Sequence, residues 1–212
     1  MTNKRTDSKV TRKSLLDAII SGIKKAQNDY YDMSEYWVGD GPEYWITTYV
    51  ARALWKISGD GTVLAEGASD TTRKEVGGRN KGRLPRLVKN KRYDIVVYWQ
   101  NGKPRAVIEI KNQVHTNLVM GDVKRVIAAL KAAQLRFGAI GYYYSAEDSK
   151  EEIALHKVRG YAKSLGEEAR ELAAEDKFKV DWDTFASTED DHAWLAGCIV
   201  IERKQGNTHK KQ

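Results

Sequence analysis

Two stretches near the start of the chain repeat apolar side chains every three or four positions, which is the spacing of one face of a helix. We predict helices over about residues 11–29 and 42–57. In the second, Asp40 can act as the cap, Pro42 suits the first turn, and Glu43 lies where the helix dipole favours an anion. The side chains expected to face the core are Leu15, Leu16, Ala18, Ile19, Ile20 and Ile23, and then Trp45, Ile46, Tyr49, Val50, Ala53 and Leu54.

The pattern then changes to one typical of β-strands. A short strand is expected over residues 62–66, followed by two strongly β-prone segments at 93–99 and 105–114. Asn101-Gly102 between the two longer segments is the best short-range signal for a hairpin. The sequence therefore predicts two adjacent antiparallel strands in the middle of the chain.

The second half alternates helical and extended patterns. An amphipathic helix over 121–134 is followed by a strand over 137–144, and strand–helix–strand order predicts a right-handed crossover and a parallel strand pair. A helix over 150–174 and two late strands, near 178–185 and 193–202, complete the expected elements. The predicted fold class is α/β, with a mixed central sheet that contains an antiparallel hairpin and a parallel crossover and is flanked by helices. We expect one domain over 12–204 with its core over about 42–145, and disordered tails at 1–11 and 205–212.

Composition narrows the class of protein. The chain has 212 residues, 41% hydrophobic and 31% charged, enough apolar side chains for a core. No apolar run reaches the roughly 20 residues that span a bilayer, and the polar N-terminus does not resemble a secretory signal. A single cysteine excludes a disulfide framework and a cysteine metal cluster. We therefore expect a soluble cytoplasmic protein with no membrane partner.

The positive charge is concentrated in one segment. The formal net charge is +7, and residues 71–93 carry nine basic side chains against one acidic, Glu75. Glycines within the segment indicate a loop, and such a dense basic run favours contact with the phosphates of a nucleic acid. Four side chains are the leading candidates for phosphate contacts: Arg79, Lys81, Arg83 and Arg86. The alternative is a solvated loop with no ligand.

The hairpin brings acidic side chains together. With Asn101-Gly102 as a two-residue turn, paired positions sum to 203, so Asp94 lies opposite Glu109, about 5 Å away on the same face. A three-residue turn would shift the pairing by one and separate the two faces. Lys111 shares the face of Glu109, and Gln113 does too if the strand continues. The alternatives are an exposed strand face with a weak ion pair and, for Gln113, a polar residue at a strand end.

Adjacent carboxylates point to a metal. They repel one another unless one is protonated or a cation lies between them, and a site of hard oxygen ligands for Mg²⁺, or alternatively Mn²⁺, resolves the conflict. A lysine beside such a site can orient a water or stabilise charge that develops on a phosphate. This chemistry suits hydrolysis of a phosphodiester.

The same residues resemble a known motif. Asp94, then fourteen residues, then Glu109-Ile110-Lys111 resembles the PD-(D/E)XK nuclease superfamily, which has the restriction-endonuclease-like fold. The resemblance covers about residues 42–145, with Tyr93 in place of the proline of the motif. It implies that Asp94, Glu109 and the carbonyl of Ile110 bind the metal and that Lys111 serves the nucleophilic water. Many members add a helical glutamate, for which Glu43 is the best match; the resemblance implies that Glu43 completes or tunes the metal shell.

The sequence thus predicts a Mg²⁺-dependent endonuclease, a hydrolase with DNA favoured over RNA by the resemblance alone and a homodimer as a plausible assembly. One alternative is a nucleic-acid-binding module that keeps the fold without catalysis. Another is a metal enzyme that acts on a small phosphate substrate.

Overall fold

The computed structural model describes residues 10–59, 61–68, 92–98, 101–113, 115–133, 135–189 and 191–203. Four helices and a short 3-10 helix are present in these residues: α1 (Arg12–Ser34), η1 (Val38–Asp40), α2 (Glu43–Ile57), α4 (Thr116–Ala132) and α5 (Glu151–Glu175). Six strands accompany them: β1 (Val63–Ala68), β2 (Arg92–Tyr98), β3 (Pro104–Lys111), β4 (Phe137–Glu147), β5 (Phe178–Glu189) and β6 (His192–Arg203). The predicted elements are therefore present, with shifted ends.

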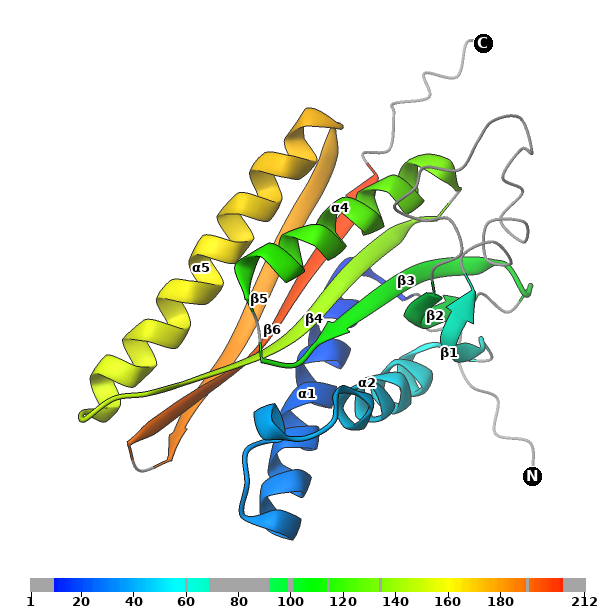
Figure 1. Cartoon of the computed structure of the whole chain (residues 1–212). Coiled ribbons are helices and arrows are strands. Elements are labelled where there is room, and N and C mark those ends of the chain that lie inside the picture. Colours follow the sequence, from blue (N-terminus) through cyan, green and yellow to red (C-terminus); the bar gives the residue numbers. More distant parts are fainter. Residues whose placement is uncertain are drawn as a thin grey trace, which may run out of the picture.

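The strands form one mixed sheet in the order β1-β2-β3-β4-β6-β5. Strands β3 and β4 pair in parallel and are joined through α4, and the other neighbours in the sheet pair antiparallel. Helices α1 and α2 lie on one face and α4 and α5 on the other (Figure 1). The predicted α/β class, the antiparallel hairpin and the parallel pair are confirmed.

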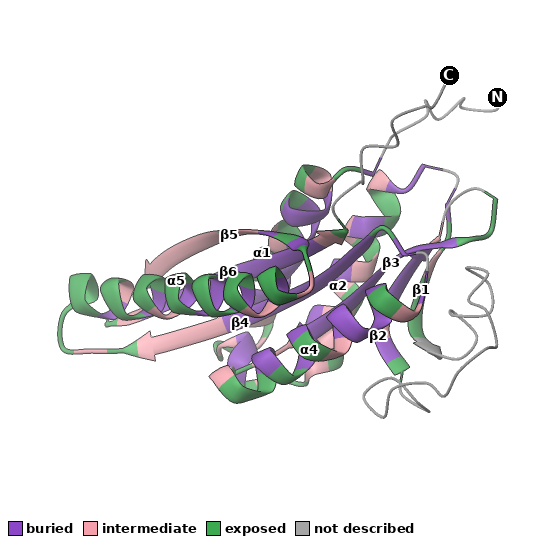
Figure 2. Ribbon diagram, turned by 90° about the horizontal axis from the view of Figure 1, so that it is seen from above, coloured by how far each residue is buried: buried purple, intermediate pink, exposed green. Residues whose placement is uncertain are grey.

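The central strand β3 is buried on both faces (Figure 2). Ala106, Ile108 and Ile110 join the apolar cluster that contains the side chains of α1 and α2. Val107 joins the cluster that contains α4 and α5. Because side chains alternate along a strand, Glu109 and Lys111 share the α4 face with Val107. The sheet thus places two charged residues, Glu109 and Lys111, on the face that α4 and α5 cover.

The hairpin register contains an irregularity that the sequence did not indicate. Near the turn Tyr98 pairs with Pro104, a sum of 202, but beyond a β-bulge Val97 pairs with Ala106 and Ile95 with Ile108, sums of 203. The bulge leaves one additional residue, Arg105, on β3. Two-residue-turn pairing is therefore wrong next to the turn and correct along the rest of the strands. If this register continues by one residue beyond the pair Ile95–Ile108, Asp94 lies opposite Glu109.

Three predicted boundaries are corrected. Helix α2 is preceded by Pro42 as its N-cap without a side-chain cap, because Asp40 ends η1 instead. Helix α4 begins at Thr116, five residues before the predicted start, because burial of Val119 and Met120 extends the helix beyond exposed Gly121. Strand β3 ends at Lys111 rather than at residue 114.

Two glycines let helices approach the sheet closely. A Cβ at Gly138 of β4 would lie 2.0 Å from Val126 Cγ1 on α4, and one at Gly141 would lie 2.7 Å from Ile19 Cγ2 on α1. No larger residue fits without displacement of a neighbour. This close packing sets how near α4 lies to β3 and β4, and so positions the polar side chains described below.

Strand β5 forms one edge of the sheet. Its face toward α1 carries Lys179, Asp181 and Asp183, and Arg12 of α1 contacts Asp181 at 2.5 Å.

In the described part of the chain, no helix is long and apolar enough to cross a membrane.

Candidate metal centre

Asp94 and Glu109 occupy neighbouring strands at the predicted positions. Asp94 is half-buried on β2, and its Oδ2 accepts a hydrogen bond of 2.6 Å from the backbone amide of Ile110. Glu109 lies one residue before that amide on β3 and is fully buried. The hydrogen bond fixes the Asp94 carboxylate against β3, so the two acids share one surface of the sheet.

Burial dominates the electrostatics of Glu109. Desolvation raises the pKa of Glu109 to about 9; Arg125 opposes the rise, while Asp94 and Asp122 add to it. Neither carboxylate oxygen of Glu109 accepts a well-aligned hydrogen bond from a described residue. Burial therefore favours the protonated form of this side chain, whereas the contact with Arg125 favours the carboxylate.

Helix α4 supplies an arginine and an acid to the same place. Arg125 Nη2 lies 2.5 Å from Glu109 Oε2 and 2.9 Å from Asp122 Oδ1. Asp122 is nearly buried, with a side chain 11% exposed. Arg125 thus bridges the two acids and partly compensates the burial of Glu109.

Lys111 lies at the end of β3 between acids from two helices. Its Nζ is 3.6 Å from Glu43 Oε1 on α2 and 3.4 Å from Asp122 Oδ2 on α4. Burial acts to lower the pKa of Lys111, but Asp122, Glu43, Asp94 and Glu109 together outweigh it and raise the pKa. The ammonium therefore stays charged, and it is held at the mouth of the acidic group.

Asn112 anchors the segment that carries Glu43. Its backbone amide donates to Glu43 Oε2 at 3.2 Å. Its side-chain Nδ2 donates to the carbonyls of Val38, Gly39 and Gly41 at 2.8, 3.2 and 2.8 Å. The turn before α2 is thereby fastened to the end of β3, and this brings Glu43, distant in sequence, beside Lys111.

The remaining predicted site residues have different outcomes. Ile110 contributes its amide to Asp94, and its side chain is buried among those of α1 and α2. Gln113 follows the end of β3 with a positive φ of 52°, so the strand alternation that placed it on the Glu109 face has ended. Its side-chain amide packs instead against Gly39 of η1. The four predicted phosphate contacts, Arg79, Lys81, Arg83 and Arg86, lie outside the described residues.

The donor types of this group suit a divalent cation, although no three of its carboxylate oxygens lie within 4.8 Å of one another. Four carboxylates (Asp94, Glu109, Asp122 and Glu43) face only two cationic side chains, Lys111 and Arg125. Glu109 Oε1 accepts no hydrogen bond from a described residue, and Arg125 and Lys111 contact Glu109 Oε2 and Asp122 Oδ2 as ion pairs without a well-aligned hydrogen bond. An ion between Asp94 and Glu109 would neutralise the excess charge and supply the missing partner, as oxygen-ligand sites for Mg²⁺ do.

A second acidic group lies elsewhere in the sheet. Glu147, Asp191 and His192 bring one ligand atom each within 4.8 Å of one another, the one such set of three among the described residues. Both carboxylates are exposed, and the imidazole of His192 stacks on Trp37 at 5.4 Å between ring centroids. Both imidazole nitrogens of His192 already contact these acids: Nδ1 lies 2.7 Å from Asp191 Oδ1, and Nε2 lies 3.6 Å from Glu147 Oε2.

Sequence reasoning missed Asp122 and Arg125. A start of the helix at residue 121 places Asp122 in a first turn, where an acidic residue is ordinary. A start at Thr116 places it four residues before Val126 on the buried stripe, where a charge is unusual. A charged residue in register with Val119 and Val126 is the signal that could have found it.

No protein-family model matches the chain, and neither does any curated protein or solved structure.

Proposed function

We propose that this protein is a Mg²⁺-dependent nuclease that hydrolyses phosphodiester bonds in DNA, as an endonuclease. The observation that carries the proposal is the meeting of Asp94, Glu109 and Lys111 on one face of β2 and β3. Glu43 joins the group from α2. A metal-dependent phosphodiester hydrolase needs acidic ligands for a cation and a positive group near the reacting phosphate, and these residues supply both.

Each side chain has a role in this proposal. Asp94 and Glu109, with the carbonyl of Ile110, would hold the ion, which would supply Lewis-acid activation of the phosphate and of a water. Glu43 and Asp122 hold the ammonium of Lys111 from opposite sides. Lys111 orients the attacking water and stabilises negative charge on the phosphate oxygens. Because burial favours the protonated form of Glu109, an ion bound there would compete with a proton.

The arrangement of the elements supports the same proposal. The hairpin β2–β3, then α4 and then β4 follow the order that the PD-(D/E)XK resemblance implies. We therefore propose a restriction-endonuclease-like fold. The basic segment that contains Arg79, Lys81, Arg83 and Arg86 precedes β2 and is proposed to contact the nucleic-acid backbone. Cleavage of both strands would use a homodimer.

One contact favours a second candidate, a nucleic-acid-binding module that does not cleave. Arg125 already lies 2.5 Å from the carboxylate that the ion would take. If Arg125 stays paired with Glu109, the acids and Arg125 form a structural network that does not bind a metal ion. The two candidates differ in one measurable property: only the nuclease needs the ion.

The deciding experiment incubates the protein with supercoiled plasmid, linear duplex, single-stranded DNA and RNA, each with Mg²⁺, Mn²⁺ or EDTA. We expect metal-dependent cleavage of DNA. Lys111→Met should lower the rate by about 100-fold or more, because the charge at the phosphate is lost while the side-chain stem is kept. Asp94→Asn should abolish cleavage.

Lys124→Met is the matched control, since it removes an exposed lysine from the same helix that carries Asp122. Its cleavage rate should equal that of the wild type, and circular dichroism should show all variants folded. Equal cleavage by Lys111→Met and Lys124→Met would refute the role of Lys111. DNA retention without cleavage under every metal condition would favour the binding module.

A further inference from the structure

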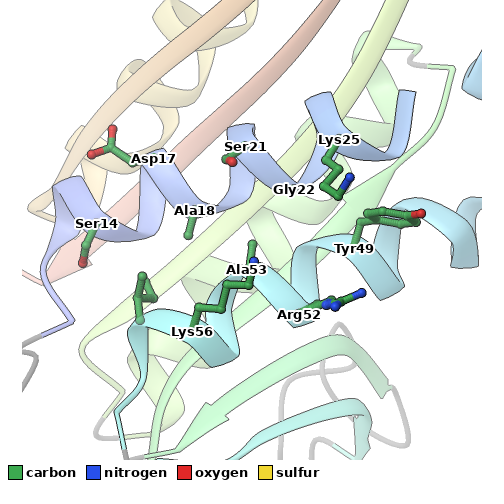
Figure 3. A pocket seen from close by; sticks show the side chains of 11 residues that line it. Ser14, Asp17, Ala18, Ser21, Gly22, Lys25, Tyr49, Arg52, Ala53 and Lys56 are labelled. Atoms are coloured by element: carbon green, nitrogen blue, oxygen red, sulfur yellow. The ribbon is translucent and has the colours of Figure 1, made fainter. Parts of the chain in front are cut away.

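A groove between α1 and α2 lies outside the candidate metal centre. It has a volume of about 460 Å³, within the range of small-ligand sites. Figure 3 shows that its walls come from one side of each helix. The small side chains of Ala18 and Ala53 leave the space open, and the ring of Tyr49 closes one end. Gly22 is part of the lining because its missing side chain lets Val50 of α2 approach α1. The groove therefore has an apolar body with polar groups around it.

The charges around the groove are unequal. Its lining contains Lys25, Arg52 and Lys56 but only one acid, Asp17. Two of these charges are already compensated: Lys25 contacts Asp29 at 2.9 Å, and Asp17 contacts Lys13 at 3.4 Å. In Figure 3 Asp17 points away from α2, and Lys56 reaches into the space between the helices.

Arg52 and Lys56 remain as the excess. Neither makes an ion pair with a residue that the structure describes. Two cations without an ion-pair partner, of which Arg52 is attracted at longer range by Asp29, match the charge of a phosphomonoester, about −1.5 to −2 at neutral pH, better than that of a carboxylate or a single phosphodiester. The guanidinium of Arg52 also offers paired donors that suit phosphate oxygens. Hydroxyls of Ser14 and Ser21 add further hydrogen-bonding groups to the lining.

We infer that this groove binds a small organic phosphate, a phosphomonoester whose uncharged body rests on Ala18, Ala53 and the Tyr49 ring while Arg52 and Lys56 hold the phosphate. The site is separate from the acidic group around Glu109 and does not depend on the proposed nuclease activity. Adenosine 5′-monophosphate is a suitable probe because it combines a phosphomonoester with an uncharged body that contains a flat aromatic base.

The test is calorimetric titration of the full-length protein with this nucleotide, with adenosine and with ribose 5-phosphate, in EDTA so that the metal centre is not involved. We expect binding at about 1 mM or tighter for the nucleotide and at least about tenfold weaker binding for adenosine. The double variant Arg52→Gln/Lys56→Gln should weaken nucleotide binding at least about tenfold. Ala53→Leu, which fills the groove without a charge change, should weaken it as well.

Lys24→Gln/Lys163→Gln is the matched control, because it removes the same two charges from outside the lining. Lys24 lies over the ring of Phe185, and Lys163 is on α5. Unchanged binding in this control supports a defined site, whereas an equal loss in both double variants would overturn it. No binding of either phosphate by the wild type would overturn it too. So would an unphosphorylated oligonucleotide that binds with the same dependence on Arg52 and Lys56, since the groove would then contact a nucleic-acid backbone.

Discussion

The side chain of Asn112 offers a sharp test of how the site is assembled. Its amide nitrogen has two hydrogens and donates to three carbonyls, those of Val38, Gly39 and Gly41. Asn112→Ala removes the equivalent of two hydrogen bonds, a loss of about 2 kcal/mol at about 1 kcal/mol each. Asn112→Asp keeps the shape but turns a negatively charged oxygen toward the same carbonyls. We expect Asn112→Asp to destabilise the fold by about 3 kcal/mol or more.

The chain contains a matched control. Asn101 is exposed, and its Oδ1 accepts a hydrogen bond from the amide of Lys103 at 3.1 Å. Asn101→Asp keeps that acceptor, so its effect should stay within about 0.5 kcal/mol. Urea unfolding followed by circular dichroism measures both variants. If Asn112→Asp and Asn101→Asp shift the midpoint equally, then Asn112 does not fasten the turn before α2 to β3.

Three other predictions concern Glu109, Arg125 and two glycines. Because burial raises the pKa of Glu109 to about 9, the folded state binds an additional proton between about pH 4.5 and 9. The free energy of unfolding of the metal-free protein should therefore fall as pH rises through that window. In urea unfolding midpoints measured from pH 5 to 9, Glu109→Gln should show a smaller fall than the wild type. Equal falls in the two proteins would contradict the raised pKa of Glu109. Arg125→Met removes the cation between Glu109 and Asp122 and should lower stability by about 3 kcal/mol or more in thermal unfolding at pH 10, where Glu109 is ionised, and by less if Glu109→Gln is also present; equal losses in both backgrounds would count against the contact. A Cβ at Gly160 of α5 meets no atom within 4 Å, whereas one at Gly138 clashes with Val126. Gly160→Ala should therefore stabilise by about 0.5–1 kcal/mol and Gly138→Ala should destabilise, and melting temperatures that move in the same direction would refute the packing described for α4.

The strand pattern and one dipeptide were enough to predict the acidic pair. Asn101-Gly102 and the β-prone segments on either side of it fix which strands are neighbours. The alternation along β3 places Ile108 and Ile110 away from Glu109, as observed. These features are local, and local features are what a single sequence carries.

The register was predicted correctly although the turn was not. Next to the turn the pairing sums to 202, which taken alone would set Asp94 opposite Ile108 and separate the two acids. The additional residue on β3, Arg105, restores the sum to 203. Arg105 is buried, and its guanidinium contacts the carbonyl of Val10, 95 residues away in sequence. No pattern near the hairpin indicates a bulge that is stabilised from so far away.

The contacts of α4 were not predictable for a similar reason. Asp122 and Arg125 reach Glu109 and Lys111 because α4 lies close to the sheet, and that closeness depends on the lack of a side chain at Gly138. The fit of a helix against a sheet involves residues far apart in the chain. Local periodicity predicts the helix and its apolar stripe, but it does not predict how closely the helix packs against a strand.

The outer strand β5 bears on how copies of this protein can associate. An edge strand exposes unpaired backbone groups that a second copy could extend into a larger sheet. If two copies paired antiparallel about Trp182, each Asp181 would oppose the Asp183 of the other copy, and like charges in opposed positions repel. Repulsion between these carboxylates, reduced where Arg12 contacts Asp181, therefore disfavours pairing of two β5 strands, and low pH or concentrated salt would weaken the repulsion.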